Sequence, residues 1–176
     1  MRIVKPLLVG LFTLFLVFTG ISLMFPSQVM TSKWVMVARD DSGVLAEIRD
    51  LRAWPSWNDL LTGVSDMQVS QKTSHSDTGS RISWTDPRGG SNSMTVTENN
   101  KNGIVTVVRL GDERPFESGF SVQKRTADSV QVVWFIIEKM KWYPWEKFYG
   151  MMAAEMKGPL MQSSLERLKM KLETGP

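Results

Sequence analysis

Thiol chemistry is absent from this chain of 176 residues, because it contains no cysteine. This absence excludes disulfides, cysteine nucleophiles and cysteine-ligated metals, although it does not decide the compartment. Histidine is nearly absent too, since His75 is the only one, and it lies in a polar loop without an evident partner. We interpret His75 as a surface residue and not as a catalytic base. No phosphate-binding glycine loop, nucleophile elbow or metal-ligand cluster occurs, so the motifs predict no catalytic residue, metal or cofactor.

Concentrated charge is lacking as well. The formal net charge is +3, and residues of both signs are interspersed along the chain. Without a basic cluster, we predict no binding of nucleic acid. Four charged residues on or near the predicted strands either point into a cavity, where one could act as a general acid or base, or form outward cross-strand pairs, which is the orientation we favour. They are Arg81, Glu98, Arg109 and Asp112.

A long hydrophobic run stands at the amino end. Residues 7–25 form an uncharged stretch of about 19 residues, close to the roughly 20 that cross a bilayer. We predict a membrane anchor over residues 1–26. The alternative is a cleavable signal peptide with Gly20 and Ser22 at its cleavage site, but the apolar run continues beyond that site.

The charges around this run predict its orientation. Arg2 and Lys5 are the only charges that precede it. By the positive-inside rule, the amino end lies in the cytoplasm and the rest of the chain lies outside it, in the periplasm if the cell is bacterial. About 150 residues then remain, the usual size of one domain with one core. We expect a connector at 27–33 and one domain at 34–173.

Within that domain, apolar alternation and turn residues predict an antiparallel meander. A first strand at 34–38 precedes a helix that begins at the acidic caps near Asp40 and ends near Leu51. A second short helix is expected to run from the Trp54-Pro55 corner to Leu61. Six further strands follow, joined by short loops such as the turn at 87–90. Their expected ranges are 64–71, 79–86, 93–98, 104–110, 116–124 and 130–140.

The longest predicted element is a helix over residues 145–172. Its large apolar side chains recur every three or four residues, which predicts one continuous stripe. Pro159 removes a backbone donor, so we expect a kink or short break at Gly158-Pro159. A helix of this length needs a broad partner, and the sheet is the only candidate. The stripe consists of Trp145, Phe148, Met152, Met156, Met161, Leu165, Leu168 and Leu172.

Two motifs carry a resemblance to a known family. They are Asp50-Leu51-x-x-Trp54-Pro55-x-Trp57 and the Gly158-Pro159 pair followed by Leu165-x-x-Leu168-Lys169. With the order of elements, they resemble the polyketide cyclase/dehydrase and lipid transport branch of the START-like superfamily, also called SRPBCC, over nearly all of residues 30–173. The resemblance implies an α+β helix-grip fold, in which a curved antiparallel sheet wraps the C-terminal helix around an apolar cavity. Several such proteins also begin with a membrane anchor.

The resemblance implies a hydrophobic ligand more than a reaction. The main hypothesis is a membrane-anchored module that binds a lipid or other hydrophobic small molecule between sheet and helix. The alternatives are a cyclase/dehydrase-type enzyme with a buried ionisable residue and a closed-core domain that binds protein partners. Trp54 and Trp57 either border the pocket mouth or brace their corner. The residues expected to line the pocket are Trp84, Met94, Trp134, Phe148, Met152 and Met156.

Overall fold

The chain forms one long antiparallel sheet with its main helix across it. A computed structural model describes residues 4–61, 64, 66–70, 78–85 and 89–174. The helices are α1 (Val4–Leu23), α2 (Asp41–Arg49) and α3 (Pro144–Thr174), with a 3-10 turn η1 (Trp54–Ser56). The strands are β1 (Gln28–Val37), β2 (Gln68–Ser70), β3 (Arg81–Thr85), β4 (Ser91–Asn100), β5 (Gly103–Leu110), β6 (Phe116–Lys124) and β7 (Val130–Lys139). His75 and part of the turn at 87–90 lie outside the described residues.

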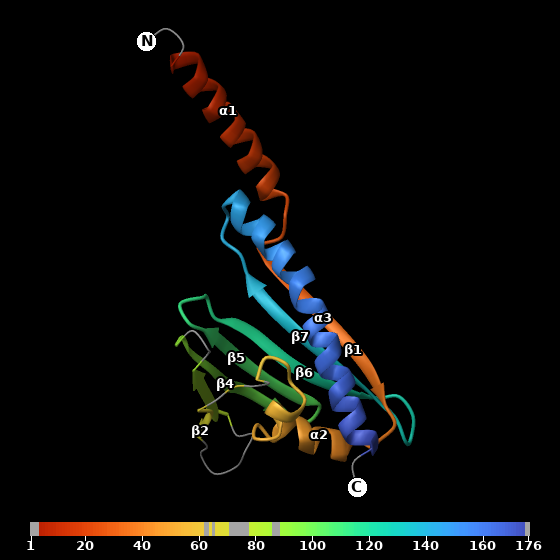
Figure 1. Ribbon diagram of the computed structural model, residues 1–176. Coiled ribbons are helices and arrows are strands. Elements are labelled where there is room, and N and C mark those ends of the chain that lie inside the picture. The colour runs from red at the N-terminus through yellow and green to blue at the C-terminus, as the bar shows by residue number, and fades with distance from the viewer. Residues whose placement is uncertain (1–3, 62–63, 65, 71–77, 86–88, 175–176) are drawn as a thin grey trace.

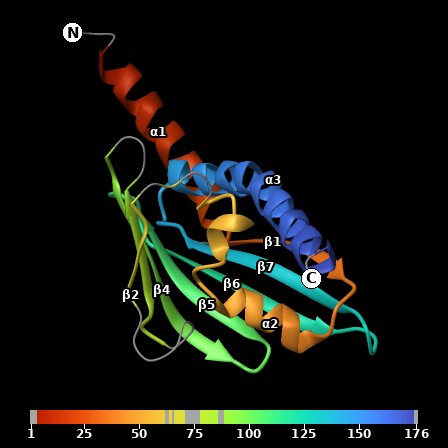
Figure 2. The same ribbon diagram turned by 60° about the horizontal axis from the view of Figure 1, so that its bottom comes forward.

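The predicted meander is confirmed, because β2 to β6 each pair with the strand that follows them in sequence. The sheet has seven strands in the order β1-β7-β6-β5-β4-β3-β2, and every pairing is antiparallel. Figures 1 and 2 show this sheet curving, with α2 and α3 on its concave side. The α+β helix-grip architecture expected from the sequence is therefore the observed one.

The first strand is longer than the sequence predicted. β1 pairs with β7 from Gln28 opposite Lys139 to Val37 opposite Val130. Residues 28–33, expected in a connector, therefore belong to the strand. Their side chains alternate between exposed and half-buried, but this pattern is too polar to be recognised as a strand without its partner. Backbone pairing with β7 organises the segment, and β1 reaches to within a few residues of α1.

The predicted acidic cap is present at the start of α2. The Asp40 carboxylate accepts hydrogen bonds from the Gly43 amide at 3.3 Å and from the Ser42 hydroxyl. These bonds to the charged form, led by that from Ser42, lower the pKa of Asp40. The second predicted helix is only the short turn η1, because Pro55 restricts the backbone and the amides of Trp57 and Asn58 both bond to the Trp54 carbonyl.

An aromatic cluster fills the concave side of the sheet. Trp54 and Trp57 contact each other at 5.5 Å between ring centroids, and both meet the Phe120 ring edge-on. Phe120 in turn stacks on Trp134 at 5.0 Å. The four rings are at most 2% exposed. Large buried rings dominate the energetics of a core, so this cluster joins the Trp-Pro corner to β6 and β7.

Helix α3 is continuous through Pro159 and bends along its length (Figure 2). The predicted break does not occur. Glu155 and Pro159 are both exposed, so the carbonyl that loses its helical partner lies on the solvent side. The carboxyl end of the helix is fixed to the start of the fold, since Arg39 donates to the Leu172 carbonyl at 2.6 Å and Lys171 reaches Glu47 at 2.7 Å.

Helix α1 stands apart from the sheet and extends away from it (Figure 1). Its length and apolar composition are sufficient to cross a membrane. Nearly all its side chains are exposed, and Ser22 near its end is buried. The helix therefore contributes almost nothing to the core of the fold.

Candidate functional site

A cavity lies beside the amino-terminal half of α3, where the helix and the sheet diverge. Its volume is about 740 Å³. One wall is a stripe of α3 whose members recur every three or four residues, and the floor comes from β6 and β7. The turn between β5 and β6 closes a third side. The helix contributes Trp145, Tyr149, Ala153, Met156 and Leu160, and apolar residues facing them are Leu60, Leu110, Pro115, Phe116, Ile136 and Met140.

One ion pair lies within this apolar wall. Lys157 Nζ is 2.5 Å from Glu138 Oε1, and both residues line the cavity. The ammonium also lies 4.4 Å from the centroid of the Phe116 ring, which is a favourable cation–π distance. The second carboxylate oxygen, Glu138 Oε2, is buried and has no hydrogen-bond partner among the described residues. The pair therefore places a carboxylate and an ammonium in an otherwise mainly apolar wall.

A second ion pair links two sides of the cavity. Arg114, in the turn between β5 and β6, bonds to Glu146 in the first turn of α3 through both terminal nitrogens, at 3.0 and 2.7 Å. A bidentate pair of this kind defines orientation as well as distance. Both residues line the cavity, so the pair holds the turn against the helix.

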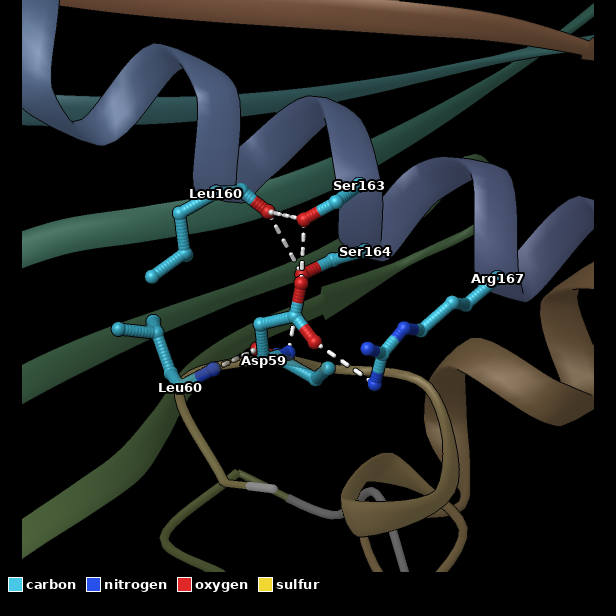
Figure 3. Close-up of polar contacts among 7 residues, drawn as sticks. Asp59, Leu60, Leu160, Ser163, Ser164 and Arg167 are labelled. Atoms are coloured by element: carbon cyan, nitrogen blue, oxygen red, sulfur yellow. Dashed lines mark hydrogen bonds and ion pairs between the residues drawn. The ribbon is translucent and has the colours of Figure 1, made fainter.

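The loop after η1 is attached to α3 by a polar latch around Asp59 (Figure 3). Its carboxylate pairs with Arg167 at 2.9 Å and accepts a hydrogen bond from the Ser163 hydroxyl, while its backbone amide donates to Ser164 Oγ at 2.9 Å. Leu60 follows directly in the chain and lines the cavity. The latch therefore positions one apolar residue of the cavity wall.

The three sheet residues predicted to line the pocket lie in the closed core. Trp84, Met94 and Trp134 point to the concave side, but they are buried and are not part of the wall of this cavity. The aromatic cluster occupies the space that the prediction left for a ligand. Trp134 is further held by a hydrogen bond from its indole to Ser118 Oγ at 2.8 Å.

The three helix residues predicted to line the pocket are all exposed. Met156 lies on the cavity wall, whereas Phe148 and Met152 are 45% and 66% exposed and are not part of the wall. Small residues occupy the inward face of this half of α3, since Gly150, Ala153 and Gly158 are buried. The helix therefore approaches the sheet along these small residues, while Phe148 and Met152 point outward.

Trp54 and Trp57 brace their corner and do not line the cavity. The Trp54 indole donates to the Ile48 carbonyl at 2.8 Å, in the buried interior. The four charged residues considered for a role in the cavity are exposed and point outward. They are Arg81, Glu98, Arg109 and Asp112. The register, however, places Arg81, Arg109 and Glu98 opposite Thr95, Ser93 and Val105, so these three do not form the expected cross-strand charge pairs.

Sequence reasoning missed Glu138 and Lys157, although a signal for the first was present. Trp134 was expected to line the pocket from the last predicted strand, and the alternation of side chains along a strand places Ile136 and Glu138 on the same face. An acidic residue that continues an inward apolar series requires a partner or a cavity. The position of Lys157 opposite it depends on how α3 crosses the sheet.

No family model matches the sequence, and no curated protein matches it. Solved structures do match. A START superfamily protein from Mycobacterium smegmatis has a TM-score of 0.62 at 20% identity, covering 82% of this chain and 97% of that one. Norcoclaurine synthase from Thalictrum flavum, in complex with dopamine and hydroxybenzaldehyde, has a TM-score of 0.60 at 12% identity, covering 85% and 88%. The chain has the START-like, helix-grip fold.

A third neighbour is the protein XoxI from Bacillus cereus, with a TM-score of 0.59 at 10% identity over 82% of this chain and 95% of that one. The identities are low, so these neighbours establish the fold and not the activity. A binding protein and an enzyme can share the START-like fold. The function must therefore be inferred from the cavity and its side chains.

Proposed function

We propose that this protein is a membrane-anchored module that binds a lipid or another hydrophobic small molecule in the cavity beside α3. The observation that carries the proposal is the cavity itself, about 740 Å³ with a mainly apolar wall. Binding sites for small molecules are typically of this size, with many apolar side chains and few polar ones. The Glu138–Lys157 pair would orient one polar group of such a ligand.

Membrane attachment through α1 is the second part of the proposal. The helix is long and apolar enough to span a bilayer, and its exposed side chains have no other use in the fold. Arg2 and Lys5 favour a cytoplasmic amino end, with the START-like domain on the opposite side. A topology reporter fused after Pro176 tests this: an exported reporter should be active there, and activity of a cytoplasm-specific reporter would reverse the orientation.

An enzyme of the cyclase/dehydrase type is the second candidate, because an ionisable pair lies in the cavity. A carboxylate and an ammonium 2.5 Å apart can exchange a proton with a bound molecule. The likeness to norcoclaurine synthase is compatible with such chemistry, although it does not assign any. Mass spectrometry of molecules retained by wild type and by Glu138→Gln separates the two candidates. A binding module retains the same molecule in both, whereas an enzyme accumulates its substrate in the variant.

Photolabelling of the full chain in lipid nanodiscs tests binding directly. With a diazirine fatty acid as the probe, we expect labelled peptides to contain residues of the cavity wall, such as Phe116 and Met156. Ala153→Trp places a large ring in the cavity and should reduce this labelling at least tenfold. Met170→Trp is the matched control, since Met170 is exposed on the same helix away from the cavity, and its labelling should equal that of wild type.

Two results would contradict the proposal. A wild-type protein that takes no label in the cavity would favour the protein-interaction alternative. Equal labelling of wild type and Ala153→Trp would show that the probe binds elsewhere. Thermal unfolding of each variant, monitored by circular dichroism, confirms that a loss of labelling does not reflect a loss of fold.

A further inference from the structure

An exposed apolar surface lies at the start of α3, outside the cavity wall for the most part. We call it the juxta-anchor face, and it consists of Trp142, Trp145, Phe148, Tyr149 and Met152. Each of these side chains is between 45% and 66% exposed. Single exposed apolar residues are ordinary, but a contiguous group with two tryptophans and a tyrosine marks an interaction surface. Trp145 and Tyr149 belong to both this face and the cavity wall.

This face adjoins the end of α1. The Phe148 ring lies 6.3 Å from the Phe25 ring, measured between centroids. Ser22 Oγ donates to the Trp142 carbonyl at 3.1 Å, and the buried Lys147 ammonium donates to the Phe25 carbonyl. The junction between anchor and domain is therefore a packed contact. In Figure 1 the start of α3 lies beside the end of α1, and α3 then runs away from α1 toward the carboxyl terminus.

The length of α1 places this junction relative to a bilayer. Its 20 residues are about 30 Å long, equal to the hydrocarbon thickness of a typical bilayer. When α1 spans the membrane, Leu23 lies at the edge of the hydrocarbon, and Phe25 and Phe148 lie in the headgroup layer. Met152 is one helical turn further along α3. Met170, eighteen residues beyond it, lies about 27 Å away along the helix.

The residue types match that layer. Trp and Tyr are enriched where hydrocarbon meets water, because they combine an apolar ring with a polar atom. Lys141 is exposed next to the face, and lysines beside a membrane are attracted to anionic lipids. The nearby Glu146 is paired with Arg114, so its charge is compensated. The occupant that fits these observations is the bilayer crossed by α1.

We propose that the juxta-anchor face lies in the headgroup layer and holds the mouth of the cavity against the bilayer. The ligand then passes between bilayer and cavity without crossing water, with Trp145 and Tyr149 shared by the two environments. This inference rests on the proposed anchor and deepens the proposed function. It identifies the source of the ligand as the membrane in which the protein sits.

The absence of cysteine allows a direct test on the full chain, because a single introduced thiol is the only one that reacts. Met152→Cys and Met170→Cys are a matched pair of exposed methionines on one helix. Each variant is labelled with an environment-sensitive fluorophore and placed in nanodiscs of phosphatidylcholine and phosphatidylglycerol. We expect headgroup-nitroxide lipids to quench the label at 152 at least twofold more than the label at 170. Aqueous iodide should show the reverse preference.

The possible outcomes separate the occupants of the face. If iodide quenches both labels equally, the face is in water and the proposal is overturned. If the label at 152 is protected from iodide and also from nitroxide lipids, a second copy or a protein partner covers the face, which overturns it too. If the chain does not float with vesicles, α1 does not anchor it and this inference fails together with the proposed anchor. If the cavity takes no photolabel, the proposed ligand binding fails, but the position of the face in the bilayer is still decided by the quenching result.

A variant tests the link to uptake. Phe148→Ser/Met152→Ser replaces two of the five apolar residues of the face by polar ones without changing a residue of the cavity wall. We expect uptake of the diazirine fatty acid from donor vesicles to slow at least fivefold, while the amount bound at equilibrium stays the same. Met36→Ser/Met170→Ser is the control, because both residues are exposed at the end of the fold away from α1. Equal uptake rates in the two variants would contradict the role of the face.

Discussion

The two halves of α3 carry similar apolar residues but use them in opposite ways. Met161, Leu165 and Leu168 are fully buried against the sheet, whereas Phe148 and Met152 face outward. The spacing of three or four residues is broken once between the two groups, because Met156 and Met161 are five positions apart. At about 100° per residue, five positions rotate the second stripe by about 140° from the first. One helix therefore carries two apolar faces, one for the core and one beside the anchor.

Between residues 150 and 158, the described positions of α3 that are buried carry small residues, namely Gly150, Ala153 and Gly158. A side-chain carbon added at Gly150 would meet the Met140 sulfur at 2.5 Å, and one added at Gly158 would meet the end of the Lys33 side chain at 3.1 Å. The helix packs closely here because little side chain intervenes. The comparison shows that a residue type at helical spacing does not by itself define the buried face.

The largest expected effect contrasts the two halves directly. Leu165→Ala removes a fully buried side chain and should lower the free energy of unfolding by about 2–5 kcal/mol. Met152→Ala, on the exposed face of the same helix, should change it by less than about 0.5 kcal/mol. Urea unfolding of the full chain in mild detergent measures both. Similar losses for the two variants would show that the halves are packed alike.

An intermediate effect is expected at the ion pair in the cavity wall. Lys157→Met leaves the Glu138 carboxylate without its cation and should cost about 1–3 kcal/mol of unfolding free energy. The double variant Lys157→Met/Glu138→Gln should recover most of this loss, because no uncompensated charge remains. The same unfolding experiment measures the cycle. If the change in unfolding free energy of the double variant equals the sum of the changes in the two single variants, the two side chains do not interact.

The smallest expected effect concerns the small residues themselves. Gly158→Ala should raise the free energy of unfolding by up to about 1 kcal/mol, because alanine favours a helix and only the flexible end of Lys33 must move. Gly150→Ala should gain less or lose stability, because its new methyl group displaces the Met140 side chain in the cavity wall. A large loss at Gly158 would mean that close backbone packing also limits that position.

Much of the fold could be predicted because its signals are local. Alternating apolar residues predicted strands at 93–98 and 104–110, within a few residues of the observed bounds of β4 and β5. The Asp40 cap marked the start of α2. The predicted range of β1 was too short, because residues 28–33 become a strand only through their pairing with β7. The candidate site was harder, since Trp134 and Met94 satisfy the same inward pattern whether they line a cavity or fill a core.

By itself, then, the sequence determined the order of the elements, the antiparallel meander, the long helix and the apolar segment at the amino end. Each depends on periodicity, turn residues or composition within one short segment. Only the tertiary structure decided which face of α3 is buried and where the cavity opens. Those features depend on how closely two distant segments approach. Here that distance depends on Gly150, which leaves room for Met140 where α3 meets the sheet, and on the latch at Asp59.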